Sequence, residues 1–155
     1  MVMDSIDKEI LRIIQKNSSI RLTELSKKVG ISTTPCWNRV KKMEEEKIIK
    51  SRVTIIDNKK VNLPLIAFLS INVPNHTDEW RVKFEKLINH NSQIIETHRI
   101  SGNHDYVLKI LSPSIEEYDH FQQNFIRESG CTNMQTSFSQ KEIKNSKNIP
   151  LDFLK

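Results

Sequence analysis

The sequence is poor in cysteine and glycine, with 2 Cys and 3 Gly among its 155 residues. Cys36 and Cys131 stand far apart and belong to no C-x-x-C pair, so neither a disulfide framework nor a zinc site is expected, and a reducing cytoplasm fits. Three glycines are too few for the glycine-rich loop that cradles a nucleotide phosphate. These two shortages disfavour disulfide-rich secreted proteins and nucleotide-binding enzymes.

Long hydrophobic runs are also missing. No apolar run approaches the roughly 18 residues that a membrane span requires. Residues 1–5 contain no basic start followed by an apolar stretch, so no secretory signal is expected. With 37% hydrophobic residues the chain can form a modest core, and its length allows one or two domains. We therefore expect a cytoplasmic protein that has no membrane partner.

Catalytic and metal-binding patterns are not recognisable either. The sequence shows no Ser-His-Asp order and no pair of catalytic carboxylates. His98 and His104 flank one predicted hairpin, where a metal or haem-type site is an alternative to two solvated histidines, the commoner situation. No i, i+4 pairing that would favour a metal site occurs among His76, His90, His98, His104 and His120. We expect no catalytic residue, no bound metal and no cofactor.

The net charge of +5 is unevenly distributed. Residues 1–60 hold 14 Lys and Arg against 8 Asp and Glu, whereas residues 61–155 hold 10 against 11. A basic half followed by a nearly neutral half indicates that the first meets a polyanion such as double-stranded DNA, although a lysine-rich surface can also be merely solvated. The polar segment 57–60 is the expected boundary, which divides the chain into domains 1–60 and 61–155.

Three amphipathic patterns within the first 46 residues predict three helices. The first follows Asp4, a suitable N-cap, and has an isoleucine face. The second starts after Arg21, a poor cap, and stops at Gly30, which takes positive φ easily. The third follows Ser32, an expected N-cap, and buries a stripe of Cys36, Val40 and Met43. This arrangement predicts a helix-turn-helix domain, and the β-branched run 48–56 predicts a strand that serves as a wing or a linking strand.

The exposed face of the third helix carries side chains that suit DNA. It mixes hydroxyl, amide and basic groups, which can bond base edges in the major groove and neutralise phosphates. The residues predicted to bind DNA are Thr33, Thr34, Trp37, Asn38, Arg39, Lys41 and Lys42. Two alternatives stay open, since Trp37 can cover the flank of the domain and Arg39 can pair with Glu24 or Glu44.

The second half alternates between strand and helix patterns. Strands are predicted over 65–73, 94–100, 105–111 and 134–143, and helices follow the caps Thr77 and Ser114. The order β-α-β-β-α-β is that of the ferredoxin-like fold. The predicted fold class is α+β: an N-terminal helix-turn-helix domain of the winged type and a C-terminal ferredoxin-like βαββαβ domain. The Lys- and Asn-rich tail beyond is expected to be irregular.

Three blocks of the chain, residues 4–11, 24–40 and 101–106, resemble the Lrp/AsnC family of transcription regulators. The resemblance covers nearly the full length. It implies an N-terminal DNA-binding domain and a C-terminal domain that drives dimerisation, often assembles further to octamers, and binds an amino acid. Lys47 and Asn62 depart from the family pattern, which usually has glycine at both positions. Asn103-His104 replaces the more usual Asp and aromatic residue, so the identity of the effector does not carry over.

The resemblance also marks a loop and the last strand as an effector site at a subunit contact. Asp105 can accept from the ammonium group of an amino acid, and loop N–H groups or serine hydroxyls can donate to its carboxylate. The predicted effector-binding residues are Gly102, Asn103, His104, Asp105, Tyr106, Ser137 and Ser139. The alternative is a plain hairpin turn in which Gly102 and Asn103 take positive φ, beside a solvated serine face.

The prediction that follows is a sequence-specific DNA-binding transcription regulator without enzymatic activity. It works as a homodimer or a larger assembly such as an octamer, and it is modulated by an amino acid. Two alternatives are an enzyme of the same architecture that resembles the sirohaem decarboxylases, and an architectural DNA-binding protein without effector. Residues 21–42 hold six basic residues and the single acid Glu24. This basic face disfavours the enzyme, which would be expected to have lost it.

Overall fold

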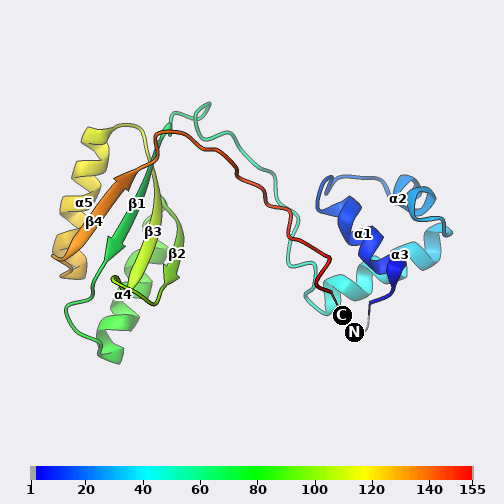
Figure 1. The fold of residues 1–155 in the computed structure, drawn as a ribbon, viewed down its shortest axis with the longest axis horizontal. Coiled ribbons are helices and arrows are strands. Elements are labelled where there is room, and N and C mark those ends of the chain that lie inside the picture. Colours follow the sequence, from blue (N-terminus) through cyan, green and yellow to red (C-terminus); the bar gives the residue numbers. More distant parts are fainter. Residues whose placement is uncertain (1–2, 155) are drawn as a thin grey trace. The chain divides into compact units, whose positions relative to one another are not determined.

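The computed structural model describes residues 3–154 and divides into two compact units. The first unit comprises the chain up to Ile55 together with the segment from Ile143 onward, and the second comprises Ile56–Glu142. The first unit (Figure 1) contains α1 (Ser5–Ile14), α2 (Leu22–Val29) and α3 (Thr33–Glu45). The second contains β1 (Leu65–Ile71), α4 (Asp78–His90), β2 (Ile94–Arg99), β3 (Tyr106–Ser112), α5 (Ile115–Ser129) and β4 (Met134–Phe138). None of the described helices is long and apolar enough to cross a membrane.

The ends of the first three helices follow from local residues. A capping box opens α1, in which the side chain of Asp4 accepts from the N–H of Asp7 at 2.8 Å and the side chain of Asp7 accepts from the N–H of Asp4 at 3.1 Å. As expected, Arg21 gives α2 no side-chain cap, and Gly30 ends α2 with φ of 72°. Ser32 occupies the N-cap position of α3 as expected, although its side chain makes no capping hydrogen bond.

The three helices enclose one apolar core, as the isoleucine face and the buried stripe predicted. Ile10, Cys36 and Met43 are completely buried. Leu25 and Val40 complete the contact between α2 and α3. Burial raises the pKa of the Cys36 thiol, which keeps it protonated and makes it part of the core and not a reactive group.

The segment that follows α3 corrects the prediction of a strand over 48–56. Residues 48–56 form no strand, and the side chains of Val53 and Ile55 are 69% and 72% exposed. β-branched residues favour extended backbone, but a strand also needs a neighbour for its N–H and C=O groups, and none of the described strands lies beside this segment. Lys47 and Asn62 take φ of 59° and 62°, the left-handed region that glycine adopts most easily, so the backbone here keeps the conformation that the family pattern implies.

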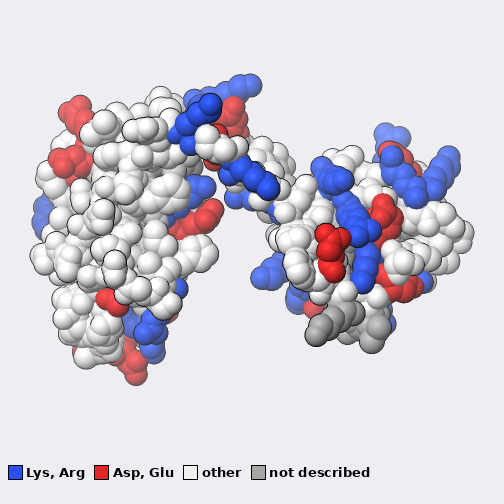
Figure 2. Space-filling model, viewed as in Figure 1, with Lys and Arg blue, Asp and Glu red and all other residues white. Residues whose placement is uncertain are grey.

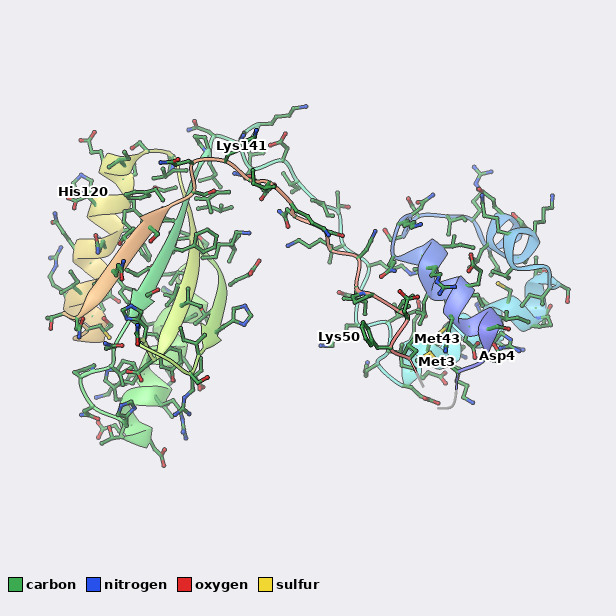
Figure 3. All side chains as sticks on the ribbon, viewed as in Figure 1. Met3, Asp4, Met43, Lys50, His120 and Lys141 are labelled. Atoms are coloured by element: carbon green, nitrogen blue, oxygen red, sulfur yellow. The ribbon has the colours of Figure 1, made fainter. Side chains whose placement is uncertain are left out.

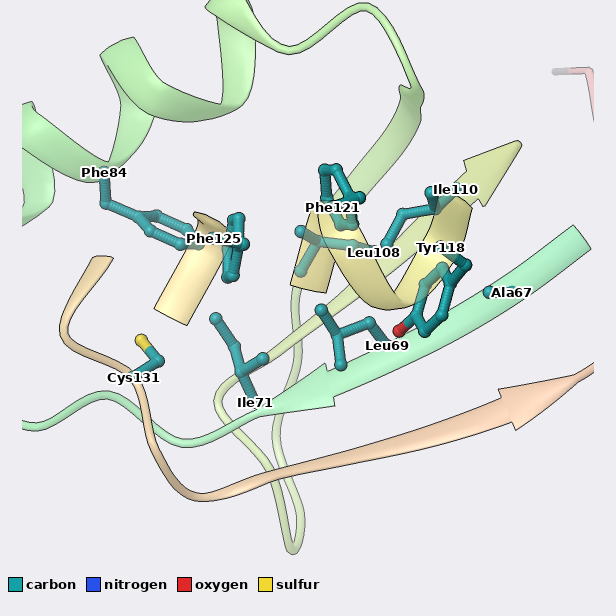
Figure 4. Close-up of a cluster of buried hydrophobic side chains, with 10 residues drawn as sticks. All are labelled: Ala67, Leu69, Ile71, Phe84, Leu108, Ile110, Tyr118, Phe121, Phe125 and Cys131. Atoms are coloured by element: carbon teal, nitrogen blue, oxygen red, sulfur yellow. The ribbon is translucent and has the colours of Figure 1, made fainter. Parts of the chain in front are cut away.

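The second unit has the predicted βαββαβ order. Its four strands form an antiparallel sheet in the order β2-β3-β1-β4. Figure 4 shows the core on one face of this sheet, where Leu69 and Leu108 meet Phe125 of α5 and Phe84 of α4. Tyr118 of α5 reaches Thr136 of β4, with 2.7 Å between the two hydroxyl oxygens. Both helices therefore cover the same face, and none of the helices within residues 3–154 covers the opposite face of the sheet.

The C-terminal segment packs against α1 within the first unit. Leu151 is buried, and Gln15 of α1 donates to the carbonyl of Ile149 at 3.3 Å and accepts from its N–H at 3.1 Å. Lys8 donates to the carbonyl of Leu154 at 2.8 Å. The tail is irregular as expected, but it lies with the first unit and not with residues 61–142. The assignment of domains to 1–60 and 61–155 stays a prediction.

Shortening Leu151 to alanine is expected to destabilise the first unit by at least about 2 kcal/mol, because a buried leucine is lost from the contact between the tail and α1. Trp37 and Trp80 are the two tryptophans of the chain, so in a W80F background Trp37 fluorescence during urea unfolding reports this unit alone. Phe153, which is 84% exposed, provides the matched control F153A. An equal midpoint for the two variants would contradict a stabilising role for the tail.

Candidate nucleic-acid interface and ligand site

The outer face of α3 is a polar surface opposite the buried stripe. Thr33, Thr34 and Asn38 are exposed, and none of them has a side-chain hydrogen bond to another described residue. Lys42 is exposed and likewise has no ion-pair partner within residues 3–154. Helical spacing places these side chains in adjacent rows on one side of α3. The structure thus brings together a set of free donors and acceptors on a rigid helix.

Trp37 and Lys41 form a pair on the same face. The Lys41 ammonium lies 4.9 Å from the centre of the Trp37 ring, a cation–π contact, and 3.8 Å from the Glu45 carboxylate. Trp37 is 49% exposed and also borders a cleft of about 430 Å³ beside Leu22 of α2. Both roles predicted for Trp37, flank cover and exposed contact, are therefore compatible with its position.

Basic side chains also surround α3 in the first unit. Figure 2 shows blue side chains over the α2 region, where Lys27 and Lys28 are exposed. Lys28 forms only a long, exposed ion pair of 3.6 Å with Glu24. Such a pair is worth little in water, so its charge stays available to a polyanion.

Arg39 differs from its neighbours because it points to α1. Its Nη1 donates to Asp4 and to Asp7 at 2.7 Å each, and the Asp7 side chain is only 4% exposed. Figure 3 labels Asp4 at the start of α1. Glu44, one of the alternative partners considered for Arg39, instead bonds Arg52 at 3.0 Å. Arg39 therefore ties the middle of α3 to the N-terminus of α1. The sequence analysis expected Asp4 to act only as the cap of α1 and did not identify it as a partner of Arg39.

The electrostatics of this cluster, which we call the Arg39 lock, favour its charged form. The pKa of Asp4 is lowered by the Asp7 N–H and then by Arg39, and the pKa of Arg39 is raised by Asp7 and then by Asp4. The Asp4 pKa is lower in the folded protein than in the unfolded chain. Asp4 therefore stabilises the fold at pH values above the ordinary carboxyl pKa, and this stabilisation is lost as the pH falls through the lowered pKa. The lock is thus intact at neutral pH.

The loop between β2 and β3 contains the predicted effector residues Gly102–Asp105. Gly102 has φ of 142°, whereas Asn103, also expected at positive φ, does not take it. Asp105 accepts from the N–H of Val73 at 2.8 Å, so its carboxylate already holds the loop against the end of β1. The Nδ1 atom of His104 is buried without a hydrogen-bond partner in the described chain. Asp105 therefore links the loop to the chain beyond β1, and its role in binding an effector stays a prediction.

The other predicted effector residues lie apart within one chain. Tyr106 begins β3 and faces the helices, with its ring 5.0 Å from that of Phe84. Ser137 lies opposite Phe68 on the uncovered side of the sheet, and the N–H of Ser139 bonds the carbonyl of Ile66. At about 3.4 Å per residue, these serines lie roughly 10 and 17 Å along β1 from the loop end of the sheet. The loop and the serines can share one ligand only across a contact between subunits.

A cleft of about 490 Å³ between α4 and β2 was missed by the sequence analysis. Its lining includes Tyr106, a predicted effector residue, together with Thr97 and Arg99 of β2. The hydroxyl of Thr97 is buried and has no partner among residues 3–154. A lone Thr and a lone Arg in a strand give no motif, so no sequence signal could have identified them.

No group of three or more His, Cys, Asp or Glu side chains is arranged to hold a metal ion within residues 3–154. His98 is exposed and lies 3.8 Å from Glu96, and His104 is the residue with the buried Nδ1. Cys131 is buried, and burial raises its thiol pKa. The described part of the chain thus offers surfaces for binding, and its thiols and histidines form no reactive constellation.

Two family models match the chain. A winged helix-turn-helix DNA-binding model matches residues 3–50, which contain α1–α3. A model of the Lrp/AsnC ligand binding domain matches residues 66–149, which contain the whole four-stranded sheet. Together the two matches cover the surfaces described above.

Individual proteins agree with the family models over the full length. The chain is 34% identical over 149 residues to a glutamate uptake regulatory protein of Zymomonas mobilis. The aligned region covers 96% of this chain and 91% of that protein. A crystal structure of an AsnC family transcriptional regulator from Agrobacterium tumefaciens has 38% identity and a TM-score of 0.94, covering 98% of this chain and 99% of that one. A transcriptional regulator from Neisseria meningitidis in complex with L-methionine has 27% identity and a TM-score of 0.92, covering 97% of each chain.

Replacing Arg39 by methionine is expected to cost about 1–3 kcal/mol of stability, because the buried Asp7 carboxylate loses its charged partner. Urea unfolding followed by Trp37 fluorescence in the W80F background measures it. Because Asp7 and Arg39 bind each other, the loss of unfolding free energy in the D7N/R39M double variant is expected to be smaller than the sum of the losses in D7N and R39M by at least about 1 kcal/mol. K28M removes an exposed ion pair on α2 and serves as control, so an R39M loss no larger than that of K28M would contradict the Arg39 lock.

Proposed function

Because this chain belongs to the Lrp/AsnC family of DNA-binding transcription regulators, we propose that it reads double-stranded DNA with α3 in the major groove. The observation that carries this proposal is the free polar face of α3 on a helix whose opposite side is fully buried. Thr34 and Asn38 are placed to bond base edges, and Lys42 to neutralise a phosphate. Its relatives are transcription regulators over the same length, so the chain is not an enzyme of the sirohaem decarboxylase type.

Arg39 has a different part in this proposal from that of its neighbours. Its Nη1 is bound to Asp4 and Asp7, although a guanidinium has five N–H donors and Arg39 remains 31% exposed. We infer that its first role is to hold α3 at a fixed angle, while its remaining donors face a nearby phosphate. Base readout then falls to Thr33, Thr34, Trp37 and Asn38, with Lys41 and Lys42 at the phosphates.

We also propose that the uncovered face of the sheet joins two copies of the chain. This face carries Phe68, which is 40% exposed, between Lys109 and Ser137 on the neighbouring strands. Val107 and Leu111 add apolar surface that none of the described helices covers. A two-fold dimer through this face would present two α3 helices to half-sites spaced by about 10 base pairs or a multiple. Assembly to an octamer is the further step that the family resemblance implies.

An amino acid is the proposed effector of this assembly. The regulator from Neisseria meningitidis, similar to this chain throughout, was solved in complex with L-methionine. In this chain the loop Gly102–Tyr106 of one subunit, facing Ser137 and Ser139 of another, is the proposed site, since one chain does not bring them together. Binding there would shift the assembly or the pose of the DNA-binding units. These activities are proposed to take place in the cytoplasm.

The variant K42A is expected to weaken binding to specific and non-specific DNA by a similar factor, because a phosphate contact carries no sequence information. The slope of log affinity against log salt concentration should fall in magnitude by about 1. Fluorescence anisotropy at several salt concentrations measures both quantities. K86A removes an exposed lysine from α4 of the other unit and provides the control. An unchanged slope in K42A would contradict the assignment of α3 to DNA.

The variant F68D is expected to raise the dissociation constant of the dimer roughly 100-fold or more, because it replaces an apolar ring with a carboxylate that the proposed interface would have to desolvate. Sedimentation velocity over a range of protein concentrations measures the change. The control I115D adds the same charge at an apolar residue of α5 that is 64% exposed. If F68D sediments like I115D and wild type, the uncovered face is not the dimer interface.

A further inference from the structure

The cleft between α4 and β2 exists because β2 is an edge strand of the sheet and α4 covers it only in part. Phe84 and Ile88 of α4 and Ile94 of β2 form its apolar wall, and Tyr106 closes one side. Its volume of about 490 Å³ lies within the range of roughly 300–1,000 Å³ that is typical of small-molecule sites. The cleft lies entirely within the second unit, so each subunit holds a complete copy.

A β-bulge decides which side chains of β2 face this cleft. Ile94 pairs with Ile110 and Glu96 pairs with Lys109, which leaves Ile95 as an extra residue in the strand. Beyond the bulge, Thr97 lies opposite the core residue Leu108. Side chains alternate along a strand, so Thr97 and Arg99 face the helices, where an unbulged strand would have placed Glu96 and His98. The bulge therefore turns a hydroxyl and a guanidinium into the cleft.

Two polar groups in the cleft have unused bonding capacity. The Thr97 hydroxyl oxygen is buried without a hydrogen-bond partner among the described residues, a state that costs free energy unless a ligand or water satisfies it. Arg99 lines the cleft and has no ion-pair partner in the part of the chain that the structure describes. Glu96 borders the cleft, but the bulge turns its side chain to the other face of the sheet, where its carboxylate lies 3.7 Å from the Lys109 ammonium that compensates its charge. A positive group beside an apolar wall suits a small carboxylate with a hydrophobic body.

We propose that this cleft binds a small aliphatic carboxylic acid, an α-amino acid or the corresponding 2-oxo acid, through Arg99 and Thr97. The carboxylate accepts from the Arg99 guanidinium and the Thr97 hydroxyl, and the aliphatic chain packs on Phe84 and Ile88. Glu85 of α4 borders the same cleft without an ion-pair partner within residues 3–154, and it can accept from an ammonium group. The proposal rests on the proposed response to an amino acid and adds to the proposed loop site a second site, formed within one subunit by residues outside the loop Gly102–Asp105.

The occupied cleft would act on that loop through Tyr106. Tyr106 lines the cleft and directly follows Asp105. The N–H of Asp105 donates to the carbonyl of Ile71 in β1 at 2.9 Å, and the Asp105 carboxylate accepts from the N–H of Val73 at 2.8 Å. Arg99 lies opposite Tyr106 in the β2–β3 pairing and immediately precedes the loop on its other side. A ligand held by Arg99 therefore contacts both ends of the hairpin that the proposed subunit contact uses.

Isothermal titration calorimetry on the full chain tests the proposal with L-leucine, L-methionine and 4-methyl-2-oxopentanoate, followed by the remaining amino acids and their 2-oxo acids. Arg99→Gln is expected to weaken every binding probe about 10- to 100-fold, since it removes a charged donor, and Arg99→Lys to restore part of the loss. Glu85→Gln is expected to weaken the amino acids and leave the oxo acids unchanged. Thr97→Val should weaken both classes, and Thr97→Ser should keep most of the affinity.

Lys86→Gln, which removes an exposed charge from α4 next to Glu85 and outside the cleft lining, is the matched control and should bind like wild type. Circular dichroism verifies that each variant is folded. If wild type binds a probe and Arg99→Gln binds it equally well, the cleft proposal is overturned while the amino-acid response stands. If Asn103→Ala alone loses binding, the ligand sits in the loop and the cleft is again excluded. If wild type binds none of the compounds, both proposals are overturned.

Discussion

One cluster of charges ties α3 to α1: Arg39 donates to Asp4 and Asp7 at 2.7 Å each. Asp7 is buried, and the same carboxylate also completes the capping box of α1. The Asp7 side chain thus helps to cap the N-terminus of α1 and also binds Arg39 of α3. In the proposed function, the side chains of α3 distinguish base pairs only if they reach the groove in a fixed geometry, and this charged contact would supply that geometry.

The second unit follows from a different constraint, the covering of a four-stranded sheet from one side only. Both helices pack on the face that carries Leu69 and Leu108, and none of the described helices covers Phe68 on the other face. The outer strand β2 is covered only in part, and the cleft lies there. The proposed dimer surface and the proposed ligand cleft are thus two consequences of one two-layer architecture, on opposite sides of the same sheet.

Features set by neighbouring residues could be predicted from the sequence: the Asp4 cap, the turn at Gly30 and the βαββαβ order. Features set by distant partners could not. Arg39 bonds residues more than 30 positions away, and the Ile48–Ile56 run has strand propensity but lacks a neighbouring strand. The bulge at Ile95 changes which side chains enter the cleft, and a single inserted residue leaves no signal in the pattern of a strand. The separation of the predicted effector residues likewise depends on strand register.

The central claim, that two copies of α3 read DNA under the control of a small ligand, is tested most directly by selecting DNA fragments bound by the full chain, with and without amino acids. The account predicts enrichment of an inverted repeat whose half-sites are centred about 10 base pairs or a multiple apart, and a changed enrichment with at least one amino acid. Binding without sequence enrichment, unchanged by every amino acid, would contradict it and indicate an architectural DNA-binding protein instead.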